Sequence, residues 1–359
     1  MKKILISGYY GFDNFGDDAI LHAMVYELKK HLTNPRITVI SNNPAKIKRI
    51  YDVDSIHRFN SKEIIKKMKS CNVFISGGGS LLQDVTSCRS FIYYLSLIFL
   101  AKYFGKKTII FAQGIGPIST IIARFLTKLV LSKVDLITVR DKESQTFLKK
   151  LGVNSILATD PAWSLEISTE EKLLKVDKIN IGVQLREWKT LTNKNINVIA
   201  NILSEKFNDE KNCINLISLQ DTHDLEIMQR LKNILLKKDL HSEVRIYSGL
   251  SIDQSINILG NLDYLIGMRF HACLISANFN VPTLALSYDP KVTSLALESK
   301  MPFINMNALN KSKDNFVLKL DELISNKEKI RYDLKEFSEK KSQICRDNFV
   351  LLLNTIIQE

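Results

Sequence analysis

The amino-acid sequence predicts an α/β protein made of two Rossmann-like domains, each a doubly wound parallel sheet. Short apolar runs of strand length alternate with amphipathic helical stretches along the chain, which is typical of βαβ units. The chain has 359 residues, 45% of them hydrophobic, and this length exceeds one ordinary core. A polar stretch at residues 168–172 separates two sets of alternating segments, so we expect a linker there.

The first set of strands defines the N-terminal domain, which we expect to cover residues 1–165. Amphipathic stretches such as 19–32 and 122–132 alternate with these strands and predict helices between them. A C-terminal helix at about 340–359 is expected to complete the domain. The expected strands are 3–6, 37–40, 73–75, 108–111 and 136–139.

The second set of strands defines a C-terminal domain at residues 175–330. The tail is helical in pattern, with a last helix from about Arg331 onward. Two doubly wound domains followed by a helix that crosses back form the glycosyltransferase-B arrangement, although architecture alone does not establish chemistry. The expected strands are 179–183, 213–218, 244–247, 264–266 and 283–286.

The chain is basic, with a formal net charge of +12 at pH 7. Lysines are spread over many segments and no block of five or six like charges occurs, so a nucleic-acid partner is not indicated. A diffuse positive field favours anionic substrates or an anionic membrane surface. A solvated lysine-rich surface explains the composition equally well.

The cysteines and the apolar runs indicate a cytoplasmic protein. Five scattered cysteines without a CxxC pair support neither a disulfide framework nor a zinc site, and no metal-ligand spacing is present. The N-terminal apolar run is too short for a signal peptide. The longest apolar stretch, 91–101, is shorter than the ~20 residues that span a bilayer, so it predicts a buried helix.

A glycine-containing loop, residues 8–18, follows the first strand directly. Glycine permits positive φ and close approach of the backbone to a ligand, which makes Gly11 a candidate. Asn14 and Asp17 follow, and the next helix is expected to begin near Asp17, whose side chain either caps it or holds a sugar hydroxyl. The spacing differs from GxGxxG, so dinucleotide binding is not indicated.

Three further segments follow strands of the first domain. In 76–80, Gly78 and Gly79 predict backbone N–H groups around a ligand oxygen, and the nearby Gln83-Asp84 pair can bind polyols. Residues 113–117 are a further glycine-containing segment after a strand, with Pro117 suited to the first turn of a helix. Arg140 comes directly after the strand at 136–139. We therefore expect loops that contact a ligand along one edge of this sheet.

Arg269, Phe270 and His271 follow a buried strand of the second domain. Ligands bind at the carboxyl edge of open α/β sheets, where Arg can grip a phosphate or carboxylate and His can exchange a proton. The alternative is an ordinary helix N-terminus with one surface Arg and one packed His.

Taken together, these segments resemble the polysaccharide pyruvyl transferase family over nearly the whole chain and in the same order. The nearest branch resembles the bacterial enzyme that adds a pyruvyl ketal to N-acetylmannosamine in a lipid-linked precursor of the secondary cell-wall polymer, whose product anchors surface-layer proteins. The matching segments are 8–18, 76–84, 113–117, 140–144, 160–162, 267–271 and 287–292.

The resemblance implies a glycosyltransferase-B-like fold and a transfer from phosphoenolpyruvate, a co-substrate, with no other cofactor and no metal. Arg269 and Arg140 match the family's donor-binding arginines, Phe270 stands where the family commonly has Leu, and His271 becomes the expected proton donor. His223, which follows a strand, is the other histidine considered for a substrate role. The acceptor is then left to the loops of the first domain, at Gly11, Asn14, Asp17, Gly78, Gly79 and Gln83.

The same resemblance implies a lipid-linked glycan acceptor at the inner membrane face. The expected location is the cytoplasm, with a peripheral position at the membrane face and a homo-oligomer both left open. Two other functions stay open at this point. One is a glycosyltransferase that uses a nucleotide sugar on the same architecture, and the other is a non-catalytic binding module that would tolerate loss of His271.

Overall fold

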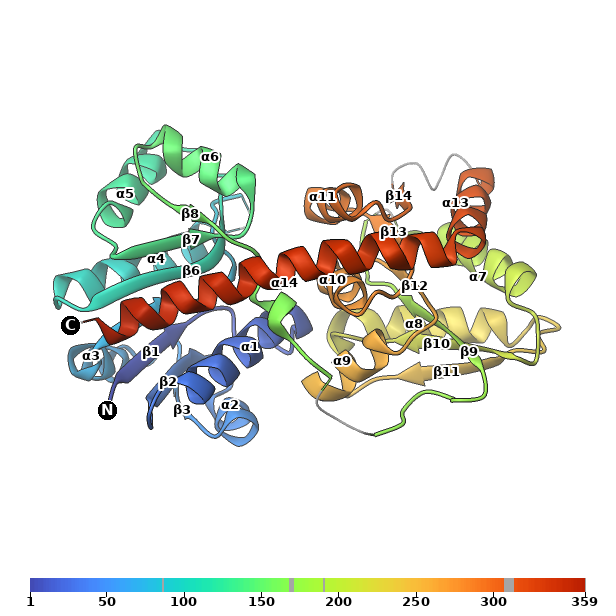
Figure 1. Ribbon diagram of the computed structural model, residues 1–359, viewed down its shortest axis with the longest axis horizontal. Coiled ribbons are helices and arrows are strands. Elements are labelled where there is room, and N and C mark those ends of the chain that lie inside the picture. The colour runs from blue at the N-terminus through green and yellow to red at the C-terminus, as the bar shows by residue number, and fades with distance from the viewer. Residues whose placement is uncertain (86, 168–170, 190, 307–312, 359) are drawn as a thin grey trace. The chain divides into compact units, whose positions relative to one another are not determined.

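A computed structural model describes residues 1–85, 87–167, 171–189, 191–306 and 313–358 (Figure 1). The chain divides into two compact units. The first unit consists of Met1–Ser164 with Gln343–Glu359, and the second of Leu165–Ser342. Each contains a parallel sheet with helices between successive strands, so the predicted fold class is confirmed. Of the predicted linker, residues 168–170 lie outside the described part.

The sheet of the first unit has the order β3-β2-β1-β4-β6-β7-β8, with β5 paired to β6, and every pairing is parallel. The sequence pattern did not predict three short strands of this sheet, β3, β5 and β8. The strands are β1 (Lys3–Ser7), β2 (Arg36–Ser41), β3 (Asp54–His57), β4 (Val73–Ser76), β5 (Gly79–Leu82), β6 (Lys107–Ile115), β7 (Leu136–Val139) and β8 (Ile156–Leu157).

The helices of this unit begin at polar residues whose side chains accept a backbone N–H of the first turn. Asn14, Asn43, Asn60, Ser87, Thr120 and Asp141 supply these caps. The helices are α1 (Phe15–His31), α2 (Pro44–Tyr51), α3 (Ser61–Ser70), α4 (Cys88–Tyr103), α5 (Ile121–Leu131) and α6 (Lys142–Lys150), and a 3₁₀ turn, η1 (Pro161–Ser164), ends the segment.

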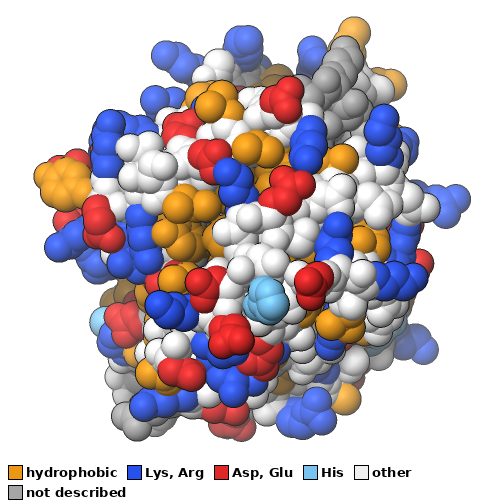
Figure 2. Space-filling model, turned by 90° about the vertical axis from the view of Figure 1, so that its right-hand side faces the viewer, with side chains coloured by type: hydrophobic (Ala, Val, Ile, Leu, Met, Phe, Trp, Pro, Cys, Tyr) orange, Lys and Arg blue, Asp and Glu red, His pale blue; other side chains and the backbone are white. Residues whose placement is uncertain are grey.

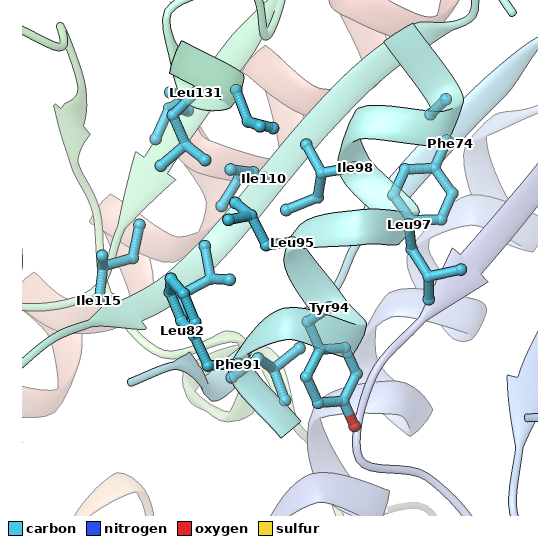
Figure 3. Packing of buried hydrophobic residues seen from close by; sticks show 14 of the residues in the cluster. Phe74, Leu82, Phe91, Tyr94, Leu95, Leu97, Ile98, Ile110, Ile115 and Leu131 are labelled. Carbon is cyan, nitrogen blue, oxygen red and sulfur yellow. The ribbon is translucent and has the colours of Figure 1, made fainter. Parts of the chain in front are cut away.

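Helix α4 covers one face of this sheet. Phe91, Leu95 and Ile98 pack with strand residues such as Phe74 and Ile110 in one buried cluster (Figure 3). The prediction that residues 91–101 form a buried helix is correct for this face only, since Ile92 and Phe99 of the same helix are exposed.

The sheet of the second unit has the order β11-β10-β9-β12-β13-β14, again with parallel pairings. Its strands are β9 (Ile179–Gln184), β10 (Asn212–Ile217), β11 (Glu243–Tyr247), β12 (Tyr264–Gly267), β13 (Thr283–Ser287) and β14 (Phe303–Asn305). Its helices are α7 (Asn193–Lys206), α8 (Asp221–Leu235), α9 (Ile252–Gly260), α10 (Phe270–Asn278), α11 (Pro290–Ser299), α13 (Lys313–Ser325) and the start of α14 (Lys327–Ile357).

Helix α14 contributes to both units, because the division falls between Ser342 and Gln343. In its final turns Cys345 Sγ lies 3.7 Å from the carbonyl oxygen of Asp160, and the Phe349 ring packs on Phe111 at a centroid distance of 5.0 Å. Apolar packing of this kind attaches the last helix to the first unit.

In each sheet the chain reverses its direction of winding between two adjacent strands. These are β1 and β4 in the first unit and β9 and β12 in the second. Such switch points open a crevice at the carboxyl ends of the strands, where ligands of open α/β sheets bind. Most of the predicted site residues follow β1, β4 or β12, whereas Arg140 follows β7 and Gln83 follows β5.

Candidate functional site

Arg269 is the N-cap residue of α10 and follows β12 at the switch point of the second unit. Its backbone N–H donates to Gln184 Oε1 at 2.7 Å, at the end of the neighbouring strand β9. Its guanidinium donates to both carboxylate oxygens of Asp224, from Nε at 2.8 Å and from Nη2 at 2.5 Å. Because Arg269 is buried, the alternative of a surface Arg is wrong.

Asp224, the fourth residue of α8, is fully buried and holds this arginine in place. Its Oδ2 also accepts the N–H groups of Leu219 and Gln220, each at 3.1 Å. Gln220 in turn accepts a 3.1 Å bond from Nη2 of Arg269. The guanidinium is therefore pre-positioned by Asp224 in the first turn of α8 and by Gln220, the N-cap residue of that helix.

His271 lies in the first turn of α10, beside Phe270. Their rings meet edge to face, with centroids 5.0 Å apart and an interplanar angle of 86°. Both residues are partly exposed, although the Nε2 atom of His271 is itself buried. His223 is exposed in the first turn of α8, where its carbonyl accepts the Glu187 N–H at 3.0 Å.

A third group at this edge, Arg186 with two aromatic rings, was missed by the sequence analysis. Arg186 follows β9, and its Nη1 donates to the Tyr288 hydroxyl at 3.1 Å. Its guanidinium lies over Trp188 and Tyr288, at 5.3 and 5.4 Å from the ring centroids. Its Nε is buried and has no hydrogen-bond partner among the described residues. Of these three residues, only Tyr288 lies in a segment of the family resemblance, residues 287–292.

In the first unit, the glycines around β1 and β4 make room for the ring of Tyr10. A Cβ on Gly8 would lie 2.3 Å from that ring, and a Cβ on Gly77 would lie 2.0 Å from its hydroxyl. The Gly77 N–H donates to the Ser7 carbonyl at 2.8 Å. Gly8 and Gly77 are therefore explained by packing, which weakens the inference from glycine content to ligand binding.

The predicted acceptor residues lie in the same loops. A Cβ on Gly78 would meet Ile20 at 2.9 Å, whereas Gly79 has a φ of +92° and starts β5. Gly11 has a φ of +76°, which favours glycine. Gln83 donates to the Ser80 carbonyl at 3.4 Å and is partly exposed.

Helix α1 begins two residues earlier than predicted. Asn14, and not Asp17, is its N-cap, because the Asn14 Oδ1 accepts the Gly16 N–H at 3.3 Å. The Asn14 amide donates to Asp17 Oδ2 at 2.5 Å, so the two predicted acceptor residues are hydrogen-bonded to each other. Both are partly exposed.

Asp18 is a buried carboxylate in the same turn. Burial raises its pKa from the usual 3.8 to about 6, and Lys46, at 3.9 Å, opposes this shift. Its Oδ1 is buried with no hydrogen-bond partner among the described residues. Asp18 is therefore the titratable group of this loop whose protonation changes near neutral pH.

Arg140 lies at the end of β7 and is engaged within the first unit. Its Nη1 donates to Asp160 Oδ2 at 2.7 Å and its Nη2 to Ser80 Oγ at 2.9 Å. Residues 113–117 were expected to form a loop, but Gln113 and Gly114 belong to strand β6. Pro117 does not start a helix, because α5 begins at Ile121.

Asp84, which the sequence analysis considered for polyol binding, has a structural function in this unit. Its carboxylate accepts the Ser119 N–H at 2.8 Å and the Thr120 N–H at 3.3 Å. These bonds hold the segment that leads from β6 into α5.

An aromatic group surrounds Arg58 at the carboxyl edge of the first sheet, and the sequence analysis missed it. The Arg58 guanidinium lies 5.1, 5.0 and 4.7 Å from the ring centroids of Phe12, Phe59 and Tyr93. Tyr9 stacks on Phe12 with centroids 4.0 Å apart. These residues come from segments far apart in the sequence, and rings with a cation among them suit the flat faces of sugars.

Comparisons with known proteins decide the family. The polysaccharide pyruvyl transferase family matches residues 14–290, which is more than half of the chain. The chain belongs to the polysaccharide pyruvyl transferase family. It is similar to the amylovoran biosynthesis protein AmsJ of Erwinia amylovora, at 21% identity over 91% of this chain and 93% of that protein. The protein is accordingly a pyruvyltransferase of polysaccharide synthesis.

Solved structures show the fold of this pyruvyltransferase to be glycosyltransferase-B-like. UDP-GlcNAc 2-epimerase from Neisseria meningitidis, solved with UDP-GlcNAc, matches with a TM-score of 0.66 at 11% identity and covers 100% of both chains. A glycosyltransferase from Rickettsia africae matches with a TM-score of 0.65 at 14% identity, covering 100% of this chain and 99% of that one.

The described ranges of the pyruvyltransferase lack two features, a metal-binding cluster and a membrane-spanning helix. No group of three or more His, Cys, Asp or Glu side chains there has an arrangement that could hold a metal ion. No helix in that part of the chain is both long and apolar enough to cross a bilayer. Over the face shown in Figure 2, Lys and Arg side chains are interspersed with Asp and Glu.

Proposed function

We propose that this enzyme transfers a pyruvyl group from phosphoenolpyruvate to two hydroxyls of one sugar in a lipid-linked cell-wall polysaccharide precursor. The product is a cyclic ketal, and phosphate is released. N-acetylmannosamine is the acceptor sugar that the sequence resemblance favours. The observation that carries the proposal is the placement of a pre-positioned Arg269 next to His271 at the switch point of the second sheet.

The donor is assigned to the carboxyl edge of the second unit. Phosphoenolpyruvate carries a phosphate and a carboxylate, and guanidinium groups bind both through charge-assisted hydrogen bonds. Asp224 and Gln220 engage Nε and Nη2 of Arg269, which leaves Nη1 as the group we assign to the donor. Arg186, with its buried Nε, is the second cation of this edge. Arg140 keeps its proposed donor role from the first unit.

The reaction needs a proton at the methylene carbon of phosphoenolpyruvate. We assign its delivery to His271, which is two residues after Arg269 and partly exposed. Protonation converts the methylene to a methyl group and leaves an oxocarbenium-like carbon, to which one sugar hydroxyl adds. The C–O bond to phosphate then breaks, and the second hydroxyl closes the ring. One hydroxyl proton restores His271, and the other leaves with the phosphate.

The acceptor is assigned to the first unit. The ring faces around Arg58 suit stacking against sugars, and its guanidinium suits a diphosphate. The partly exposed polar side chains of Asn14, Asp17 and Gln83 supply hydrogen bonds to hydroxyls. The backbone at Gly11, Gly78 and Gly79 borders the same edge.

The test is to incubate the purified protein with phosphoenolpyruvate and a panel of disaccharide-diphosphate-lipid analogues. We expect release of inorganic phosphate and the mass of a pyruvyl ketal on one acceptor, with His271→Gln as the inactive control. A parallel set with UDP-sugars in place of phosphoenolpyruvate tests the nucleotide-sugar glycosyltransferase, with which the fold of the structural relatives is compatible. Glycosyl transfer without phosphate release from phosphoenolpyruvate would overturn the proposal.

A further inference from the structure

Helix α5 turns its apolar side away from the protein. Its buried residues include two small ones, Ala123 and Thr127, which let the helix lie close to the sheet. Val130 and Leu131 near its C-terminal end are also buried, but the large apolar side chains of its first turns are exposed: Ile121 by 83%, Ile122 by 74% and Phe125 by 64%. An amphipathic helix on a globular domain normally buries such residues. Leu126 and Leu129 extend the exposed stripe by one further turn.

Helix α4, which packs against α5, is apolar on its outer side as well. Ile92, Phe99 and Tyr103 are exposed by 60%, 52% and 72%, at a spacing that places them along one side of the helix. We call these residues together the α4–α5 face: Ile92, Phe99, Tyr103, Ile121, Ile122, Phe125, Leu126 and Leu129. A group of large exposed apolar side chains of this extent marks an interaction surface.

The charged residues of α4 and α5 themselves all have a single sign. The two helices carry Arg89, Lys102, Arg124 and Lys128 and contain no Asp or Glu. Of the nearest acidic residues along the chain, Asp84 binds the N–H groups before α5, whereas Asp135 pairs with Lys102 at 2.8 Å and so offsets one of these four cations. The face is thus apolar with cations and no anions of its own.

This combination determines which partner fits. Two copies of the same face would bring like charges together, and the whole chain already carries a net charge of +12. A bilayer that contains anionic lipid offers both an apolar interior for the Ile, Leu and Phe side chains and negative headgroups for the cations. Charge complementarity therefore favours a membrane over a second copy.

We propose that the α4–α5 face docks on the surface of an anionic membrane, with α5 lying in the plane of the headgroups. Helix α5 begins six residues after the end of β6, at the carboxyl edge of the first sheet. The docked surface would therefore lie next to the loops assigned to the acceptor. This proposal extends the proposed function, which needs a lipid-linked acceptor, but binding to lipid tests it without any turnover.

The test is co-sedimentation of the full chain with phosphatidylcholine vesicles, with and without phosphatidylglycerol. Wild-type protein is expected to bind the anionic vesicles. A triple variant, Ile122→Ser, Phe125→Ser and Leu129→Ser, is expected to bind them at least tenfold more weakly, because three apolar side chains are lost from the face. Arg124→Gln and Lys128→Gln should each weaken binding about fivefold, and only to the anionic vesicles.

A matched triple variant controls for surface polarity. Leu236, Leu297 and Leu318 of the second unit are 61%, 65% and 63% exposed, and their replacement by Ser should leave vesicle binding unchanged. Circular dichroism should show that both triple variants are folded, since all six positions are exposed. With a water-soluble acceptor analogue, the α4–α5 variant should keep wild-type turnover, which separates a failure of docking from a failure of the proposed function.

Three results would overturn the docking proposal. The first is wild-type protein that does not bind anionic vesicles, and the second is a triple variant that binds them as tightly as wild type. The third is a wild-type dimer in sedimentation velocity that the triple variant converts to a monomer, which would show that the face joins two copies.

Discussion

Arg269 and Asp224, 45 residues apart in the sequence, form a two-bond ion pair, with Nε–Oδ2 at 2.8 Å and Nη2–Oδ1 at 2.5 Å. Asp224 is fully buried and Arg269 is nearly so. The pair positions the guanidinium for a ligand, but it also means that a variant of Arg269 changes the stability of the second unit. Donor binding and folding must therefore be measured separately at this position.

Removal of Arg269 alone should destabilise the protein. Arg269→Ala leaves the Asp224 carboxylate buried without its cation, and breaking such a pair costs about 3–5 kcal/mol. Urea denaturation checks this loss. The double variant Arg269→Ala, Asp224→Asn should recover much of it, because no charge then stays buried. Equal losses in the single and double variants would contradict a buried ion pair.

Loss of His271 should abolish transfer while sparing the donor. His271→Gln is expected to reduce turnover by about 10²–10⁴-fold, the usual contribution of general acid catalysis. Calorimetric titration with phosphoenolpyruvate should show an affinity close to that of wild type. His223→Gln is the matched control, because the exposed His223 is expected to keep full activity. A fully active His271→Gln protein would remove the proton-donor assignment.

The two cations other than Arg269 can be compared directly for donor binding. Arg186→Ala should weaken phosphoenolpyruvate binding by about 1.5–3 kcal/mol, the value of one charge-assisted hydrogen bond. Arg140→Ala tests the contribution from the first unit in the same titration, with folding followed because it breaks the bond to Asp160. Unchanged affinity in one variant would assign the donor to the other arginine, and unchanged affinity in both would remove the two assignments.

Gly77 is expected to be required for packing. In Gly77→Ala the new Cβ would lie 2.0 Å from the Tyr10 hydroxyl and 3.2 Å from Cζ, so the variant should have a lower melting temperature. Adding Tyr10→Phe removes the closest contact and should restore part of the loss. No rescue by Tyr10→Phe would contradict the packing explanation.

A Val side chain at Gly78 would meet Ile20 in the same way, so Gly78→Val would also disturb packing. Gln83→Ala and Phe59→Ala are therefore cleaner tests of acceptor binding.

Asp18 should make stability depend on pH. Its pKa is raised from 3.8 to about 6 in the folded protein, so between these values the folded state binds more protons than the unfolded state. Its contribution to stability is therefore present below about pH 4 and is lost as the pH rises through about 6. The loss amounts to about 3 kcal/mol by the usual conversion.

The variant Asp18→Asn checks this prediction. It should lack this decline, so that its stability relative to wild type increases from pH 4 to pH 7. Urea midpoints at both pH values measure the difference. A constant difference between the two proteins across this range would show that the Asp18 carboxyl titrates normally.

The local pattern of the sequence determined the fold class and the placement of the candidate residues. Alternation of buried strands and helices requires parallel sheets, and parallel strands end at one edge, so Arg269, His271 and the loops after β1 and β4 could be assigned to carboxyl edges. Caps were harder to assign, because Asn14 and Asp17 are both good N-cap residues and only the backbone path selects between them.

Only the tertiary structure decided which side chains meet. The partners of Arg269 and Arg140, the rings around Arg58 and the space that Gly77 leaves for Tyr10 all join distant segments, and no local period encodes such contacts. The orientation of α5 is the clearest case. Its periodicity predicts an apolar stripe but not its direction. In the folded unit the side with Ala123, Thr127, Val130 and Leu131 is buried, and the stripe with Ile122, Phe125 and Leu129 is exposed.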